Sequence, residues 1–192
     1  ATRVGGAEGY LHWKTHKERG QDLPCAIVVG CPPYVAFMGP QKLPLGVQEL
    51  HVAGGLAGEA INVVRARTVD LLVPAEAELV IEGFVDTKVL EPEGPFGEVT
   101  GTYNAGGKSE VFKIRAMTRR RNSIFYALHC GVPVTDAQAT MGLGIEVATK
   151  KHLSTVEGGI ELLDVRSVTA SGDMMLILKL RPRQPGQAKT AL

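Results

Sequence analysis

The chain has 192 residues, of which 44% are hydrophobic and 21% charged, and its formal net charge is +1. This length is enough for one large domain with a sizeable core. The balanced charge argues against a nucleic-acid-binding surface or a polybasic membrane patch, and the apolar runs are far shorter than the roughly 20 residues that cross a bilayer. We therefore expect no nucleic-acid partner and no membrane span, and small molecules or copies of the same chain as partners.

The first part of the chain predicts two helices around a short strand. Residues 7–19 have a helical pattern that stops at Gly20, a residue suited to capping a helix. Residues 25–30 form an apolar run between turn signals, which is typical of a buried strand. Residues 46–57 favour a short helix, although its paired glycines each cost about 1 kcal/mol relative to Ala.

The rest of the chain is predicted to be rich in strands. Residues 61–73 and 78–86 alternate apolar and polar side chains, the period of half-buried strands. Further strands are predicted at 111–117, 124–128, 160–169 and 174–180, and a helix at 137–153. Strands at hairpin-like spacing with few helices indicate an α+β, β-rich fold, a β-barrel or barrel-like sheet with peripheral helices.

The chain has three cysteines, at Cys25, Cys31 and Cys130. Their number is odd, and no two of them have CxxC spacing. This pattern argues against a disulfide framework and for a reducing compartment, so we expect a cytoplasmic protein. Cys25 and Cys31 flank an apolar strand, where a buried and unreactive thiol is the more common state.

An unusual concentration of carboxylates lies in residues 91–104, EPEGPFGEVTGTYN. Pro95 suits the second position of a turn and Gly97 its end, so a turn here would fold Glu93 back toward Glu98. If both carboxylates face one cavity, repulsion and desolvation would let one hold a proton near neutral pH, as a general acid/base pair requires. The alternative is a surface turn with solvated glutamates.

Two other groups of side chains are candidate sites. His12 and His16 lie one helical turn apart and could bind a transition metal, although the Glu of an HExxH motif is missing. Arg119, Arg120 and Arg121 could bind an anion. For each group the alternative is a solvated surface. The sequence has no nucleophile elbow, dinucleotide fingerprint or P-loop.

Residues 73–104 closely resemble the signature of the UbiD family of decarboxylases, in which P-A-x-x-E-x-x-x-E-G leads into E-G-P-F-G-[ED]-x-x-G. The similarity extends through residues 12–33 and 43–78, and so covers nearly the whole chain. The resemblance implies reversible decarboxylation of an aromatic or α,β-unsaturated acid with prenylated FMN, which serves as the electron sink while the protein supplies position, a proton and electrostatics. It also implies that Glu98 donates the proton and that Glu93 orients it.

The resemblance further implies a cofactor and metal site. His12 and Glu49 match metal-binding positions and would hold Mn²⁺ or Mg²⁺ against the flavin phosphate, in keeping with the oxygen preference of these ions. Lys42, Leu43 and Pro44 fall where the family's chain passes close to the flavin.

The resemblance places residues 1–192 as the family's middle domain, a split β-barrel related to flavin-binding barrels, within a longer chain. A catalytic Arg and an Asn metal ligand would precede it, and a further domain that drives homo-oligomerisation would follow it. We expect this fragment to be inactive alone. An alternative is a non-catalytic flavin-binding or subunit-assembly module of a multi-subunit carboxylase.

Overall fold

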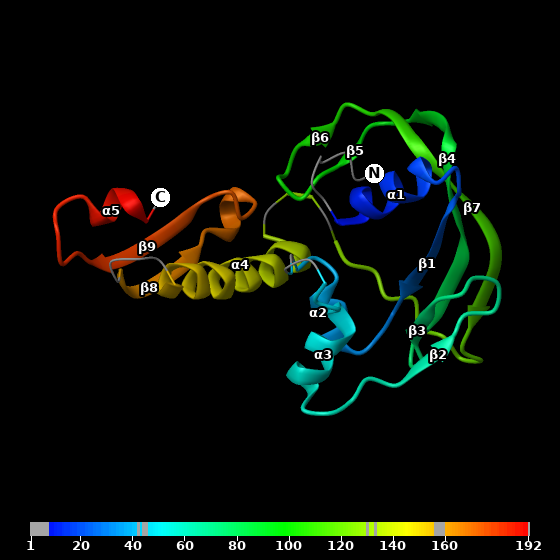
Figure 1. Cartoon of the computed structure of the whole chain (residues 1–192), viewed down its shortest axis with the longest axis horizontal. Coiled ribbons are helices and arrows are strands. Elements are labelled where there is room, and N and C mark those ends of the chain that lie inside the picture. The colour runs from blue at the N-terminus through cyan, green and yellow to red at the C-terminus, as the bar shows by residue number, and fades with distance from the viewer. Residues whose placement is uncertain are drawn as a thin grey trace. The chain divides into compact units, whose positions relative to one another are not determined.

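The computed structural model describes residues 8–41, 43, 46–129, 131–132, 134–155 and 160–191. The chain divides into two compact units, each built from discontinuous segments (Figure 1). The first unit contains residues 1–39, 43–95 and 105–127, and the second contains residues 40–42, 96–104 and 128–192. The acidic segment singled out in the sequence therefore contributes to both units.

A three-stranded antiparallel sheet is the centre of the first unit. The long strand β4 (Leu79–Glu93) lies between β1 (Leu23–Val29) and β7 (Gly107–Arg119). Helix α1 (Glu8–Glu18) packs against β1 and β4, and the positive φ of Gly20 ends the predicted helix as expected. The strands predicted at 25–30, 78–86 and 111–117 are confirmed, and the last two are longer than predicted.

Two helices and a hairpin complete the first unit. The predicted helix at 46–57 is confirmed as α3 (Glu49–Ala57). Helix α2 (Pro33–Met38) was not predicted, because it is short and begins at the second of two consecutive prolines. The run at 61–73 forms a hairpin of β2 (Val63–Arg65) and β3 (Leu72–Pro74). A small core forms where this hairpin meets the sheet, from Val73, Ala77 and Val80 with Ala26, Val28 and Ala66.

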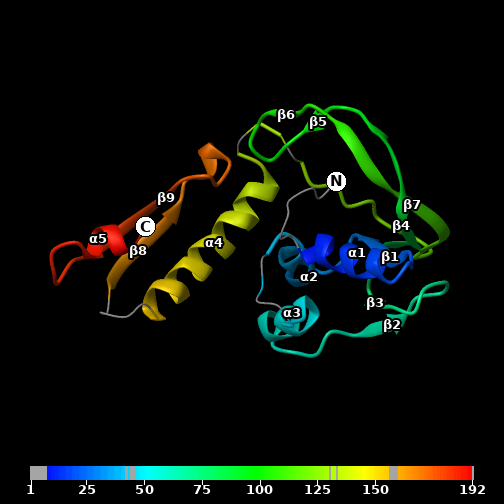
Figure 2. The ribbon, with the colours of Figure 1, turned by 45° about the horizontal axis from the view of Figure 1, so that its top comes forward.

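The second unit pairs a long helix with a hairpin. Helix α4 (Asp136–Thr155) packs along β8 (Glu161–Ser167), which pairs with β9 (Leu176–Arg181) (Figure 2). These three elements agree with the predictions at 137–153, 160–169 and 174–180. The remaining elements are a short hairpin, a 3-10 turn and a final helical turn: β5 (Phe96–Gly97), β6 (Tyr103–Asn104), η1 (Thr169–Ser171) and α5 (Gln187–Thr190).

The predicted strand at 124–128 was wrong. These residues pair with no strand, and the Ile124 N–H donates instead to a Glu78 carboxylate oxygen at 3.0 Å. Ile124 and Phe125 are 73% and 75% exposed. Although they are apolar, they are therefore not buried within this chain. The mixed, strand-rich fold is confirmed, but the described strands form one three-stranded and three two-stranded sheets, and among them no closed barrel is found.

The pairing register of β4 with β7 shifts between Val85 and Leu90. Asp86 lies at this shift, and its carboxylate binds groups on both strands. Its carboxylate accepts hydrogen bonds from the backbone N–H groups of Lys88 and Val89, at 2.7 and 3.0 Å. Its other oxygen lies 2.5 Å from Lys113 Nζ on β7. The Lys113 ammonium, with these backbone donors, lowers the pKa of Asp86 to about 2.

Acid should therefore weaken the sheet. Because the folded pKa of Asp86 lies below its ordinary 3.8, the stabilisation is complete above that value and is lost as the pH falls toward about 2. We expect Asp86→Asn to lower the urea midpoint near neutral pH and to flatten its decline in acid. Emission of Trp13, the chain's only tryptophan, reports unfolding locally, because its indole N–H donates to the Asp86 carbonyl oxygen.

Asp70→Asn is the matched control, because Asp70 pairs with Arg65 with its side chain 87% exposed. An exposed ion pair contributes little, so this variant should keep the wild-type acid slope. If Asp86→Asn and the wild type lose stability in parallel as the pH falls, the role assigned to Asp86 is wrong.

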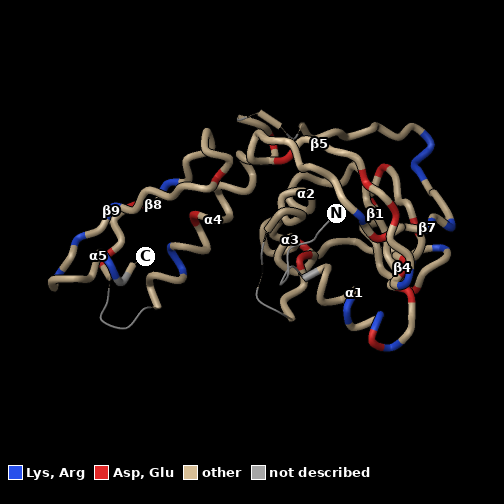
Figure 3. The backbone as a smooth tube through the Cα atoms, turned by 90° about the horizontal axis from the view of Figure 1, so that it is seen from above, with Lys and Arg blue, Asp and Glu red and all other residues tan. Residues whose placement is uncertain are grey.

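Basic residues (Lys and Arg) and acidic residues (Asp and Glu) both occur along the chain in each unit (Figure 3). None of the described helices combines the length and apolar character that crossing a membrane requires.

Candidate active site

Glu93 is the last residue of β4 and is held by β7. Its backbone lies in register with Gly107, and its carboxylate oxygen Oε2 accepts a 2.6 Å hydrogen bond from the Ser109 hydroxyl. Gly106 has φ +81°, and a Cβ there would lie 2.4 Å from the Glu93 carbonyl oxygen. Only glycine allows this close approach without displacing the backbone that carries Glu93.

Glu98 lies in the tight connection between β5 and β6. Its N–H donates to the Thr102 carbonyl oxygen at 2.8 Å, and its own carbonyl oxygen accepts from the Gly101 N–H at 3.0 Å. The Asn104 amide donates to the carboxylate oxygen Oε1 at 3.3 Å. Glu98 is half-buried. The hydrogen bonds fix both its backbone and its side chain.

The predicted turn at Pro95 and Gly97 was wrong, because the turn lies after Glu98. β4 continues to Glu93, and Phe96 and Gly97 then pair with β6, so Pro95 connects two strands. The residue with positive φ is Gly101. Glu93 belongs to the first unit and Glu98 to the second, so their action as a pair stays a prediction.

The predicted metal and flavin residues lie on several elements of the chain. His12 is exposed on α1, and its carbonyl oxygen accepts a 2.9 Å hydrogen bond from His16 Nδ1. Glu49 is the half-buried first residue of α3. Leu43 is half-buried, whereas Lys42 and Pro44 lie outside the described residues. Within the described ranges, no three His, Cys, Asp or Glu side chains are grouped to hold a metal ion.

The other acidic residues of the signature have structural partners. Glu78 binds the Ile124 N–H and the Arg120 guanidinium, at 3.0 and 2.9 Å, and these contacts lower the pKa of Glu78. This ion pair and the end of β7 at Arg119 agree with a strand end rather than an anion site.

Glu82 is almost completely buried, at 1% exposure. Its Oε2 accepts from the Thr68 N–H at 2.7 Å and from the Thr68 hydroxyl at 2.9 Å. Burial opposes its ionisation, but these bonds and one from the Arg67 N–H outweigh it and lower the pKa of Glu82. Glu82 therefore ties the β2–β3 loop to the central strand.

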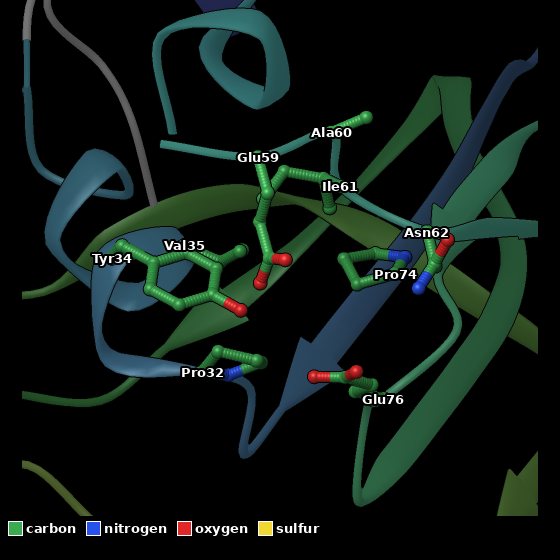
Figure 4. Close-up of a pocket in the computed structure, with 9 residues that line it drawn as sticks. All are labelled: Pro32, Tyr34, Val35, Glu59, Ala60, Ile61, Asn62, Pro74 and Glu76. Carbon is green, nitrogen blue, oxygen red and sulfur yellow. The ribbon is translucent and has the colours of Figure 1, made fainter. Parts of the chain in front are cut away.

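Two cavities lie in the first unit. One, of about 310 Å³, lies beside the Glu78–Arg120 pair and Cys31. The other, of about 20 Å³, has room for little more than one water molecule. Tyr34, Glu59 and Glu76 point toward it (Figure 4), and burial, then Glu76 and Glu59, raise the pKa of Tyr34. Sequence reasoning missed these residues, which have no motif.

The thiols of Cys25 and Cys31 are not activated. Cys25 and Cys31 are half-buried, less than predicted, and burial raises the pKa of both thiols. A raised pKa keeps a thiol protonated and unreactive, as expected. Cys130 lies outside the described residues.

Residues 2–133 match the UbiD family model, described as the 3-octaprenyl-4-hydroxybenzoate carboxy-lyase Rift-related domain. The chain is 32% identical to a phenolic acid decarboxylase of Bacillus subtilis (strain 168) over 93% of its own length and 37% of that protein. It is 31% identical to an uncharacterized protein of Archaeoglobus fulgidus over 95% of its length and 40% of that protein.

Solved structures of this class have the same fold. The evolved dimeric UbiD-class enzyme HmfF from Pelotomaculum thermopropionicum, in complex with prFMN, superposes with a TM-score of 0.87 at 26% identity, covering 98% of this chain and 43% of that one. The closed form of the Sedimentibacter hydroxybenzoicus vanillic acid decarboxylase gives 0.89 at 29% identity, covering 98% and 40%. The chain thus spans less than half of each of these relatives. The signature at residues 73–104, the matched domain and the shared fold together establish that this chain belongs to the UbiD family.

Proposed function

We propose that the full-length protein containing this chain is a UbiD-type carboxy-lyase. It removes CO₂ from an aromatic or α,β-unsaturated carboxylic acid, reversibly, with prenylated FMN as cofactor. The observation that carries the proposal is the acidic segment, in which Glu93 and Glu98 of the family signature are each fixed by a neighbouring polar side chain. Relatives named phenolic acid and vanillic acid decarboxylase favour a phenolic substrate.

In the proposed reaction, the two acids of this chain have different roles. Prenylated FMN, when bound, supplies the electron sink for breaking the C–C bond. Glu98 delivers a proton to the carbon that loses CO₂ and regains one from solvent. Because the Asn104 amide binds Oε1, we assign the transferred proton to Oε2. Glu93, oriented by the Ser109 hydroxyl, assists Glu98.

The proposal includes the metal and flavin contacts. His12 and Glu49 would offer one imidazole nitrogen and one carboxylate. The carboxylate suits Mn²⁺ or Mg²⁺, and the two donors fill fewer positions than an octahedral ion has. The flavin phosphate and other ligands would complete the coordination. Lys42, Leu43 and Pro44 would contact the flavin. The cysteine pattern supports a cytoplasmic location, and the family resemblance supports a homo-oligomer.

The first test is CO₂ release by the full-length protein supplied with prenylated FMN and Mn²⁺, using phenolic and cinnamic acids as substrates. We expect release in the wild type, and His12→Ala or Glu49→Ala to weaken Mn²⁺ binding at least about 10-fold and to reduce release with it. His152→Ala, at an exposed position near the end of α4, is the control.

Each alternative has its own outcome. Unchanged Mn²⁺ affinity in both variants would remove His12 and Glu49 from the metal site. Tight binding of the flavin and Mn²⁺ without CO₂ release from any of the acids would favour the non-catalytic module.

A further inference from the structure

Among the described residues of the second unit, Gln138 has the most completely buried polar side chain, with 0% exposure. It lies in the first turn of α4, and both ends of its amide have partners. Oε1 accepts a 2.7 Å hydrogen bond from the Thr135 N–H, and Nε2 donates to the carbonyl oxygen of Val99. The second partner is 39 positions away and follows Glu98 directly in the chain.

The Oε1 contact is a helix-capping interaction. Thr135 precedes α4 and Gln138 follows three residues later, the S/T-x-x-E/Q pattern in which the later side chain binds the N–H of the capping residue. Glu and Gln serve this purpose equally well, because it needs only an acceptor. Capping therefore does not explain the amide nitrogen.

The Nε2 contact needs a donor, which Gln provides and an ionised Glu does not. Val99 lies in the turn that begins at Glu98, and its carbonyl oxygen has this buried amide as a partner. The same turn is bounded by Gly172, where a Cβ would lie 2.9 Å from Thr100 Cα and 3.2 Å from the Val99 oxygen. The turn is therefore held by a hydrogen bond and by close backbone packing.

We propose that Gln138 is a positioning residue that holds the Glu98 turn in the place where its carboxyl can deliver a proton. The inference rests on the proposed function, because it assigns Glu98 the role of acid. Displacement of a catalytic group by about 1 Å can cost about 10²-fold in rate, so a lost anchor next to Glu98 should reduce turnover rather than binding.

Gln138→Glu is the most informative variant, because it keeps the capping acceptor and removes the donor to Val99. In the full-length protein we expect kcat to fall about 10- to 100-fold with KM changed by less than about 3-fold. A buried carboxyl can donate when protonated, so the kcat ratio of variant to wild type should rise as the pH is lowered. Gln138→Met should lower kcat without this pH dependence, and Gln184→Met, at an exposed loop position, should change nothing.

A second readout does not depend on activity. The Gly101 N–H donates to the Glu98 carbonyl oxygen, so its hydrogen exchange reports the turn itself. Exchange at Gly101 should accelerate at least about 10-fold in both Gln138 variants, while the paired amides of β8 and β9 keep their protection.

Unchanged exchange at Gly101, or faster exchange with unchanged kcat, would overturn the positioning role. Full activity of a Glu98→Gln variant would instead overturn the assignment of Glu98 as the acid, and the absence of CO₂ release by the wild type would overturn the proposed function. Hydrogen exchange does not depend on activity. The exchange result in the Gln138 variants therefore distinguishes a wrong positioning role from a wrong assignment of the acid or of the function.

Discussion

Replacing Glu98 with Gln should lower the turnover of the full-length protein by roughly 10²- to 10⁴-fold, the usual contribution of a general acid. Gln keeps the size of the side chain and an oxygen that can accept the Asn104 amide. It cannot release a proton, so the loss should fall on kcat. Steady-state CO₂ release, with flavin binding measured by absorbance in the same samples, separates lost chemistry from lost cofactor.

Glu91→Gln is the matched control for this experiment. Glu91 lies in the same acidic segment on β4, is exposed and contacts Ser109 through strand pairing. Its loss removes the same charge without removing the proposed acid, so turnover should stay within about 2-fold of the wild type, as for a surface substitution. Normal turnover in Glu98→Gln would show that another group supplies the proton.

Gly83→Ala should destabilise the fold by about 3 kcal/mol or more, or prevent folding. Gly83 lies at a register shift in β4, and a Cβ there would lie 2.1 Å from the Lys113 carbonyl oxygen and 3.1 Å from Ile114 Cα. The obstacle is backbone, and β4 is paired on its other side with β1, so it cannot move away. At about 2–4 °C per kcal/mol, the melting temperature should fall by roughly 6–12 °C.

Gly55→Ala tests the same chemical change where there is space. Gly55 is exposed within α3, and a Cβ there would meet no atom within 4 Å. Ala in a helix interior is favoured over Gly by about 0.5–1 kcal/mol, so this variant should be slightly stabilised. Thermal unfolding of both variants decides the matter: equal melting temperatures would mean that the strands adjust around Gly83.

Sequence patterns located most of the elements correctly, because periodicity reports which face of a segment is buried. The alternation at 78–86 and the helical pattern at 137–153 are each found as the expected element. The failures were local. Residues 124–128 read as a strand from their apolar character, but a strand needs a partner, and the nearest acceptor for the Ile124 N–H is the side chain of Glu78.

The acids of the family signature look alike in sequence but differ in their contacts. Glu78, Glu82, Glu93 and Glu98 are all acids of the motif, and only the tertiary structure separates them. The buried carboxylate of Glu82 accepts a hydrogen bond from the Thr68 N–H, and Glu78 forms an ion pair with Arg120. Both acids therefore have structural roles. The side chains of Glu93 and Glu98 instead bind the neutral side chains of Ser109 and Asn104.

The sequence by itself determined the family, the position of most helices and strands, and the two candidate acids, since these depend on residue type and local spacing. Only the tertiary structure decided that the turn follows Glu98, that Gly83 must lack a side chain, and that Gln138 binds Val99. The contacts of Gly83 and Gln138 join atoms from positions about 30–40 residues apart, and local propensity carries no record of such contacts. The turn itself is local, but the pairing of β4 with β7 and of β5 with β6 leaves it after Glu98.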